Sequence, residues 1–405
     1  MTCERELMGS YGRSHEVMDQ SGTLVFDDES MFLARLTAMG DIAFHEAVLA
    51  GSLRNADSVV FEGVKTCLAK ADIKFGNLET VIAEKPEIRF SKKACRVADI
   101  RAIAALRSIG VDVLSFANNH VKDMGSEGVL ETINHVTQAG IKIVGAGRNI
   151  AEARKPVVVE TKGLKVRFFA YSYAAGQIAT NRKPGCAEAD LKTIIDDLDT
   201  HEVDSDLTVL SLHMDAEFQE VPSPSRVKIC RTLADKGVQI ILCHHPHVPQ
   251  GVERWNNSLI AYSLGNYVGE VTNYMTLNSD DCWKSFHLNI DIVENGIGCV
   301  NAVPVVIGKN GRPVLANEYD NNKILKLLAD RSSLLLNEVY INKAYREMVI
   351  KWLCNCIKTT YWSIRKLEFN IVKNIIIDTF LTKTKRRWLI ACFIKKYERI
   401  NNENK

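Results

Sequence analysis

Six short polar motifs lie along the chain, and each follows an apolar stretch typical of a buried strand. In open α/β folds, ligands bind beyond the carboxyl ends of the strands, so motifs far apart in sequence can meet there. Carboxylate, amide and imidazole groups together suit divalent metals such as Zn, Mn or Fe, so the pattern predicts a metal site. The motifs are Gly40-Asp41, Asn77-Leu78-Glu79, Asn118-Asn119-His120, His213-Met214-Asp215, His244-His245-Pro246-His247 and Ser263-Leu264-Gly265-Asn266.

The first two motifs each supply a carboxylate. Asp41 follows the first expected strand, where a carboxylate could bind metal or could simply cap the next helix. Side chains alternate along an extended segment, so Asn77 and Glu79 point to the same side. One amide and one carboxylate could therefore address the same ion. Each of these motifs alone is weak evidence for a metal site, and the prediction depends on all six motifs together.

The segment Asn118-Asn119-His120 follows the apolar stretch Val111–Ala117 without a gap. Asn119 could coordinate through its carbonyl oxygen, while Asn118 is expected beside the substrate. His120 could give or take a proton near neutral pH, and Asp123 could orient it through the second ring nitrogen. The alternative is an Asn-rich turn in which His120 caps the next helix and Asp123 favours its first turn.

Histidine is concentrated in the two motifs that follow Leu207–Leu212 and Val238–Leu242. Three histidines within four residues are hard to explain by packing, because each buried imidazole needs hydrogen-bond partners. The histidine cluster is therefore the strongest single indication of a metal, and Asp215, His244 and Asn266 are expected to line the substrate pocket. A solvent-exposed histidine-rich turn is the alternative.

The elements that would position these motifs alternate between apolar strands and helical patterns from Met31 to about Gly308, which indicates an α/β fold. Ser223 before Pro224 predicts a helix start, and Val129, Ile133 and Val136 predict one apolar helix face. The expected strands are Phe32–Met39, Asp72–Phe75, Val111–Phe116, Lys142–Val144, Val166–Tyr171, Leu207–Leu212, Val238–Leu242, Leu259–Tyr262, Phe286–Ile292 and Val300–Val306.

The charge is distributed unevenly over the 405 residues. From Lys343 to the end there are 15 Lys/Arg and 5 Asp/Glu, whereas the rest of the chain carries 36 basic and 44 acidic residues. We therefore expect a mobile polar leader over 1–30, an α/β domain over 31–310 and a basic, all-helical region over 311–405. That region could be a helical cap, could lie on an anionic membrane surface, or, least favoured, could contact nucleic acid.

The expected location is the cytoplasm or the inner face of a membrane. The 11 Cys are scattered without a C-x-x-C pair, which favours a reducing compartment. No apolar signal-peptide core is visible in the first 30 residues, and nowhere do about 18 apolar residues run together.

The order of these motifs resembles the CapA-type family of bacterial capsule and poly-γ-glutamate synthesis proteins, over about residues 31–308. The resemblance also includes Gly145-Ala146-Gly147, Val248, Gln250 and Tyr262-Ser263-Leu264-Gly265-Asn266-Tyr267. It implies a four-layer α/β sandwich of the calcineurin-like metallophosphoesterase type. It further implies two divalent metal ions (Mn, Fe or Zn) held at positions such as Asp41, Glu79, Asn119, His213, His245 and His247, with His120 as the proton donor.

The resemblance leaves the activity open between several hypotheses. The first is a metal-dependent hydrolase acting on a phosphoester or amide bond of an anionic polymer or ester. The second is a non-catalytic component of capsule assembly that binds or exports polymer, and the third is a scaffold in which the helical tail acts. Family members usually have His-Trp-Gly at His213-Met214-Asp215 and Gly at Cys243, so the pocket lining of this chain differs from the family pattern.

Overall fold

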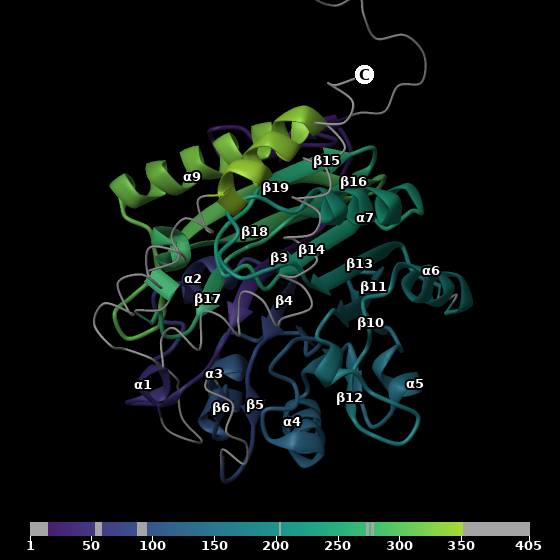
Figure 1. Cartoon of the computed structure of the whole chain (residues 1–405), viewed down its shortest axis with the longest axis vertical. Coiled ribbons are helices and arrows are strands. Elements are labelled where there is room, and N and C mark those ends of the chain that lie inside the picture. Colours follow the sequence, from purple (N-terminus) through teal and green to yellow (C-terminus); the bar gives the residue numbers. More distant parts are fainter. Residues whose placement is uncertain are drawn as a thin grey trace, which may run out of the picture.

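The computed structural model describes residues 15–52, 59–86, 95–201, 204–272, 275–276 and 279–350. Within these residues, two large β-sheets form the centre of the molecule (Figure 1). The β13 sheet consists, in spatial order, of β1 (His15–Val17), β15 (Val252–Trp255), β16 (Ser258–Ala261), β14 (Ile240–His244), β13 (Leu207–His213), β11 (Leu164–Ser172) and β10 (Val157–Thr161).

The second large sheet, the β3 sheet, has two short strands beside its main path. Its main path is β2 (Thr23–Val25), β19 (Gly296–Ile307), β18 (Lys284–Val293), β3 (Phe32–Ile42), β4 (Ile73–Leu78), β7 (Val113–Ser115) and β8 (Lys142–Val144). Strand β17 (Asn266–Val268) pairs with β3, and β20 (Pro313–Leu315) pairs with β19. Two small pairs complete the strands, β5 (Val81–Ile82) with β6 (Val97–Ala98) and β9 (Ala146–Gly147) with β12 (Gly185–Cys186).

Helices connect these strands, and all ten strands expected from the sequence occur, with some bounds differing by a few residues. The helices are α1 (Glu46–Leu49), α2 (Lys65–Leu68), α3 (Arg101–Ser108), α4 (Gly125–Gln138), α5 (Ile150–Ala153), α6 (Leu191–Thr200), α7 (Pro224–Asp235) and α9 (Glu318–Ser333). Short 3-10 turns occur at η1 (Ala175–Gln177), η2 (Asp280–Trp283) and η3 (Leu334–Leu336), and a further helix includes residues 338–350.

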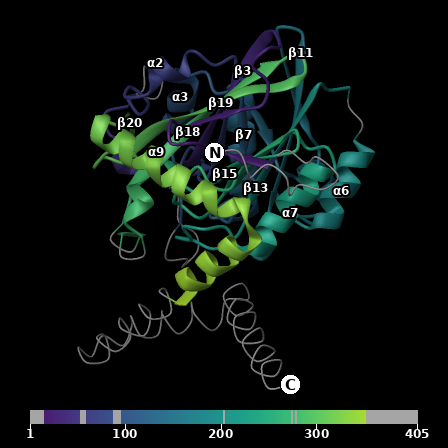
Figure 2. The ribbon, with the colours of Figure 1, turned by 90° about the horizontal axis from the view of Figure 1, so that it is seen from above.

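The two sheets share one apolar core because alternate residues of each strand point to opposite faces. In β13, Leu207 and Val209 join the core between the sheets, where Phe75 and Phe168 stack with ring centroids 5.8 Å apart. The intervening Leu210 and Leu212 instead pack with α6 and α7. Helices α6 and α7 lie on one side of the molecule and α2 and α3 on the other (Figure 2). The same alternation places His213 on the face between the sheets.

Helix α7 begins where the sequence predicts. The Ser223 side chain accepts a hydrogen bond from the Arg226 backbone N–H, and Pro224 occupies the first helical position. This cap satisfies one of the N–H groups that have no partner within the helix. Cys230 and Leu233 are buried against the β13 sheet, as the apolar stripe indicates.

Residues 15–30 differ from the expected mobile leader, since they include two paired strands. Strand β1 pairs with β15, and β2 pairs with β19. The reason is that the edges of both sheets offer unpaired backbone groups that these short segments satisfy. Residues 1–14 lie outside the described residues.

The C-terminal region is not helical throughout, as was expected, because residues from 313 onward first pair with β19 as strand β20. Helix α9 follows and packs across the β3 sheet beside β19 (Figure 1). Ile324 and Leu328 enter the shared core, and Arg331 donates a hydrogen bond to the Pro249 carbonyl in the loop after β14. Arg331 also pairs with Asp281 at 2.5 Å. The basic segment from residue 351 onward lies outside the described residues, and among those described no helix is both long and apolar enough to cross a bilayer.

A buried ion-pair network joins β15, α7 and β1. Glu253 is fully buried and accepts hydrogen bonds from Arg231 (2.7 and 3.0 Å) and the Tyr262 hydroxyl (2.8 Å), with His15 Nε2 at 2.8 Å. Burial acts to raise the pKa of Glu253, but the hydrogen bonds from His15 and Arg231 outweigh it and lower that pKa. The charged form is therefore favoured by folding.

We predict that Glu253→Gln lowers the free energy of unfolding by about 3–5 kcal/mol, because it leaves the Arg231 charge buried without its counter-ion. Urea unfolding at pH 7 measures this change. A lowered folded-state pKa means that the contribution is complete above the unfolded pKa of about 4.3 and is lost as pH falls through the folded value. The difference in free energy of unfolding between wild type and variant should therefore narrow below about pH 4.

Asp196→Asn, which breaks the exposed pair with Lys192, is the control and should change stability by less than about 1 kcal/mol. A deficit that is equally small for both variants would contradict the prediction.

Candidate metal centre

The carboxyl ends of strands from both sheets meet at one buried cluster. Side-chain donor atoms of Asp41, Glu79 and His213 all lie within 4.8 Å of one another, and the same holds for Glu79, His245 and His247. The first group comes from β3, from the end of β4 and from β13, and the second adds the loop after β14. The structure thus brings the five expected carboxylate and histidine ligands together in two groups that share Glu79, and the two expected asparagine ligands, Asn77 and Asn119, contact Asp41 and His213.

Strand pairing accounts for this convergence. The parallel register sets Asp41 opposite Asn77 in the β3 sheet and His213 opposite His244 in the β13 sheet. Because all four positions lie at strand ends, the side chains of the two sheets meet at the same edge of the core.

Asp41 lies at the centre of a hydrogen-bonded network. Its Oδ1 is 3.1 Å from His244 Nδ1, and its Oδ2 is 3.2 Å from His247 Nδ1. The Asn77 amide nitrogen donates to Asp41 Oδ1 at 2.9 Å, and metal binding through the Asn77 amide oxygen stays a prediction. His213 Nε2 lies 3.4 Å from Glu79 Oε1.

The electrostatics of the cluster are dominated by burial of like charges. Burial and the negative charge of Asp41 raise the pKa of Glu79 to about 8. Burial opposes protonation of His247, but the charges of Glu79 and Asp41 outweigh it and raise its pKa to about 9. Burial lowers the pKa of His245 to about 4, so this imidazole is neutral near neutral pH. The protein therefore holds two carboxylates together in a site that favours an added positive charge.

The donor set fits a divalent cation. Oxygen and imidazole nitrogen ligands suit Zn, Mn and Fe. In addition, His244 Nε2 and His245 Nδ1 are buried and have no hydrogen-bond partner among the described residues. Buried nitrogen atoms without a partner are uncommon in folded proteins, and a bound ion is one reason for them.

The loops that carry the histidines are locally strained. Positive φ angles occur at the non-glycine residues His245 (96°) and His247 (60°), and in the facing loop at Asp215 (84°) and Phe218 (63°). Each such residue costs about 1–3 kcal/mol, and such strain concentrates at functional sites. The ring centroids of Phe218 and His247 are 6.2 Å apart, so Phe218 borders the histidine cluster. None of the six sequence motifs includes this residue.

Gly40 and Gly265 allow the two sheet-end loops to touch. A Cβ atom at Gly40 would lie 2.1 Å from the Gly265 carbonyl oxygen, and Gly265 itself has φ 78°. Across this contact the Asp41 N–H donates to the Gly265 carbonyl at 3.0 Å. Asn266 is thereby placed beside Asp41 in β17, with its Oδ1 2.9 Å from His247 Nδ1. Asn266 thus orients a histidine of the cluster.

His120 and Asp123 form a buried pair beside the cluster. His120 Nδ1 lies 2.6 Å from Asp123 Oδ2, as the sequence predicted for an oriented histidine. Asn119 Oδ1 lies 3.1 Å from His213 Nε2, so this loop borders the metal-binding groups. Both polar atoms of the Asn118 side chain form hydrogen bonds within the protein. Its amide nitrogen donates to the Leu78 carbonyl at 2.7 Å, and its amide oxygen accepts from the His120 N–H.

Asp215 is turned toward α7, although the sequence suggested a pocket position. Its Oδ2 accepts from the Ser223 N–H at 2.9 Å and lies 3.4 Å from Nη1 of Arg226, which is fully buried. Arg226 also donates to the Tyr262 carbonyl at 2.7 Å. A signal for Arg226 was present in the sequence, because positions 226, 230 and 233 form one stripe in which an arginine stands among apolar residues.

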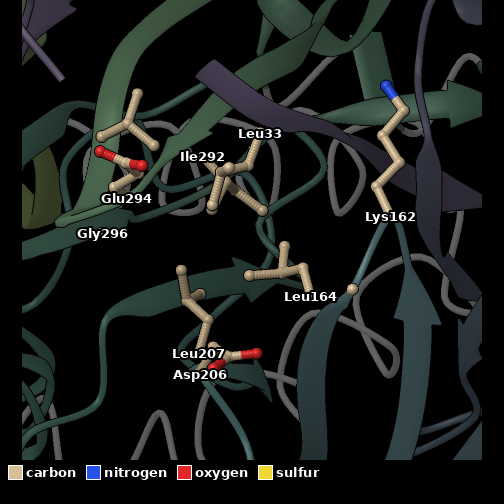
Figure 3. Close-up of a pocket in the computed structure, with 10 residues that line it drawn as sticks. Leu33, Lys162, Leu164, Asp206, Leu207, Ile292, Glu294 and Gly296 are labelled. Atoms are coloured by element: carbon tan, nitrogen blue, oxygen red, sulfur yellow. The ribbon is translucent and has the colours of Figure 1, made fainter. Parts of the chain in front are cut away.

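A separate cavity of about 240 Å³ lies at the opposite ends of the strands (Figure 3). It is lined by Leu33 and Leu207 near the beginnings of β3 and β13, and by Lys162, Leu164 and Ile292. None of the cluster residues lines it, so it is not part of the candidate metal centre.

Comparison with known proteins identifies the relatives of this chain. A capsule biosynthesis protein CapA of Bacillus anthracis is 28% identical over 307 residues, covering 74% of this chain and 73% of that protein. The PGA biosynthesis protein CapA of Bacillus subtilis is 26% identical over 285 residues, covering 69% and 73%. Among solved structures, a 5'-nucleotidase from Candida albicans has a TM-score of 0.40 at 9% identity, covering 83% of this chain and 59% of that one. The family model described as bacterial capsule synthesis protein PGA_cap matches residues 35–271. The chain, whose matched segment contains every residue of the cluster, belongs to this capsule synthesis family.

Proposed function

We propose that this chain is a metal-dependent hydrolase of capsule or poly-γ-glutamate synthesis that cleaves a phosphoester or amide bond in an anionic substrate. The biological role is supported by relatives named for capsule and PGA biosynthesis. The single observation that carries the chemistry is the meeting of Asp41, Glu79, His213, His245 and His247 beside the His120–Asp123 pair. We further propose that the two sheets with their covering helices correspond to the four-layer sandwich of metallophosphoesterases.

Two ions would be held by the two groups of donor atoms. Asp41, Glu79 and His213 form one group, and Glu79, His245 and His247 form the other. Glu79 belongs to both groups and would therefore contribute to holding either ion. Divalent ions in such a site supply Lewis-acid catalysis and neutralise the charge that develops on the substrate.

The remaining chemistry belongs to residues of this chain. Asp123 holds His120 through Nδ1, which leaves Nε2 as the nitrogen that would deliver a proton to the leaving oxygen or nitrogen. Asp123 is itself fixed by a 2.7 Å hydrogen bond from the Arg96 N–H. Both side chains are buried, which favours a fixed orientation for proton transfer.

We predict that the purified full chain binds Mn²⁺ and that Glu79→Gln weakens both binding events, because Glu79 serves both groups. His213→Ala and His247→Ala should each weaken only one of the two Mn²⁺ binding events, because each histidine belongs to one group. Metal content after dialysis measures this, and at 100 times the dissociation constant Mn²⁺ should raise the free energy of unfolding by about 2.7 kcal/mol for each site that it fills.

His135→Ala is the matched control, since His135 lies on α4 and outside the cluster. It should leave Mn²⁺ binding unchanged. A wild-type chain that binds no divalent metal would contradict the proposed centre.

We predict that Mn²⁺-loaded protein hydrolyses a phosphodiester or a γ-glutamyl amide, and that His120→Asn lowers kcat by about 10²–10⁴-fold through loss of proton transfer. Asp123→Asn should lower kcat less, because it disturbs only the orientation of His120. Initial rates with bis-(p-nitrophenyl) phosphate and γ-glutamyl-p-nitroanilide measure the effect, with equal metal content verified for each variant. Metal binding without turnover, together with binding of poly-γ-glutamate, would favour the non-catalytic polymer-binding role instead.

A further inference from the structure

Arg96 is held by its backbone between two parts of the candidate site. Its carbonyl accepts a hydrogen bond from the Val81 N–H at 3.0 Å, two residues after Glu79. Its own N–H donates at 2.7 Å to Asp123, the partner of His120. The residue therefore lies between the shared carboxylate of the metal groups and the histidine that would protonate the leaving group.

Two nitrogen atoms in this region are buried without a hydrogen-bond partner among the described residues, Arg96 Nε and His45 Nε2. A buried polar group without a partner costs about 1–3 kcal/mol, so such groups call for an explanation such as a ligand. His45 precedes α1, just beyond the end of β3 that carries Asp41.

Hydrogen bonds to one short segment bring His45 and Arg96 near each other. The Phe44 N–H, one residue before His45, donates to the Thr80 hydroxyl at 2.8 Å. The Val81 N–H, one residue after Thr80, donates to the Arg96 carbonyl. Both His45 and Arg96 therefore lie beside the segment that follows Glu79. Burial is the main cause that lowers the pKa of His45, the Glu270 charge acts to raise it, and the Arg96 charge acts to lower it.

Three other cations in the described part of the chain near the candidate site bind protein groups. Lys122 donates to the Ile178 carbonyl at 2.8 Å, and Arg226 donates to the Tyr262 carbonyl at 2.7 Å. Arg101 pairs with Asp99 and Glu46. The guanidinium of Arg96 has no such partner in the described part of the chain.

We propose that Arg96, together with His45, binds an oxyanion group of the substrate next to the bond that is cleaved. This inference rests on the proposed function and names its substrate class: a molecule with a phosphoryl or carboxylate group adjacent to the leaving atom. A guanidinium presents parallel N–H donors that match the two oxygens of either group, and charge-assisted hydrogen bonds of this kind are stronger than neutral ones.

The test is calorimetric titration of the full chain with inorganic phosphate and, separately, with glutarate, once with Mn²⁺ and once after removal of metal. We expect Arg96→Gln to weaken binding of at least one of these anions by about 10- to 100-fold. Arg96→Lys should recover part of the loss, because it restores the charge without the planar fork. The midpoint of thermal unfolding should stay at its wild-type value, which a merely structural role for Arg96 would not allow. Arg107→Gln, an exposed arginine on α3, is the matched control and should leave anion binding unchanged.

The outcomes separate this inference from the proposed function. A loss confined to phosphate assigns a phosphoryl group, and a loss confined to glutarate assigns a carboxylate. Equal affinities of Arg96→Gln and wild type for both anions overturn the inference even if Mn²⁺ binds. Failure of the wild type to bind Mn²⁺ counts against the metal centre, while the metal-free titrations still decide the role of Arg96. Should Arg96→Gln fail to fold, His45→Gln gives the second measurement, and unchanged anion binding there overturns the inference as well.

Discussion

Burying two carboxylates in one cluster is the constraint on which the candidate site depends. Asp41 and Glu79 are both almost fully excluded from solvent, and their donor atoms belong to one group with His213. In a low dielectric, two negative charges at this separation repel strongly, so the cluster needs positive charge or a proton. Without added positive charge, burial and then the Asp41 charge raise the pKa of Glu79 to about 8, which favours its protonated form. A divalent cation satisfies the same requirement without removing the ionised ligands.

The surrounding architecture serves to hold these groups despite their mutual repulsion. Parallel pairing fixes the sequence positions that face one another at the sheet ends, and the apolar core between the sheets fixes the distance between them. The contact between Gly40 and Gly265 then brings β17 against β3, so that Asn266 reaches His247. The strained loops at His245 and Phe218 are retained because this framework determines their positions from several sides.

Much of this arrangement followed from the sequence, and the failures have identifiable causes. Apolar runs predicted the strands, and the Ser223-Pro224 pair predicted the start of α7, because these signals are local. The meeting of Asp41, Glu79 and three histidines could be predicted because polar motifs at strand ends have few other uses. The direction of an individual side chain could not, since Asn77, Asn118 and Asp215 each turn toward partners that are distant in sequence. The pairing of residues 15–17 depends on a free sheet edge that no local pattern reveals.

Arg226 contacts the residues at positions 215 and 243, where the family resemblance led us to expect glycine. Asp215, at φ 84°, accepts a hydrogen bond from the guanidinium, and the Cys243 thiol lies against the same group and 3.7 Å from Cys230. Asp215, Arg226 and Cys243 therefore depend on one another. Glycine at position 215 would relieve backbone strain, but it would leave the buried Arg226 guanidinium without the Asp215 carboxylate as its counter-ion. Because the three side chains share contacts, the effects of substituting them on stability are expected to be non-additive.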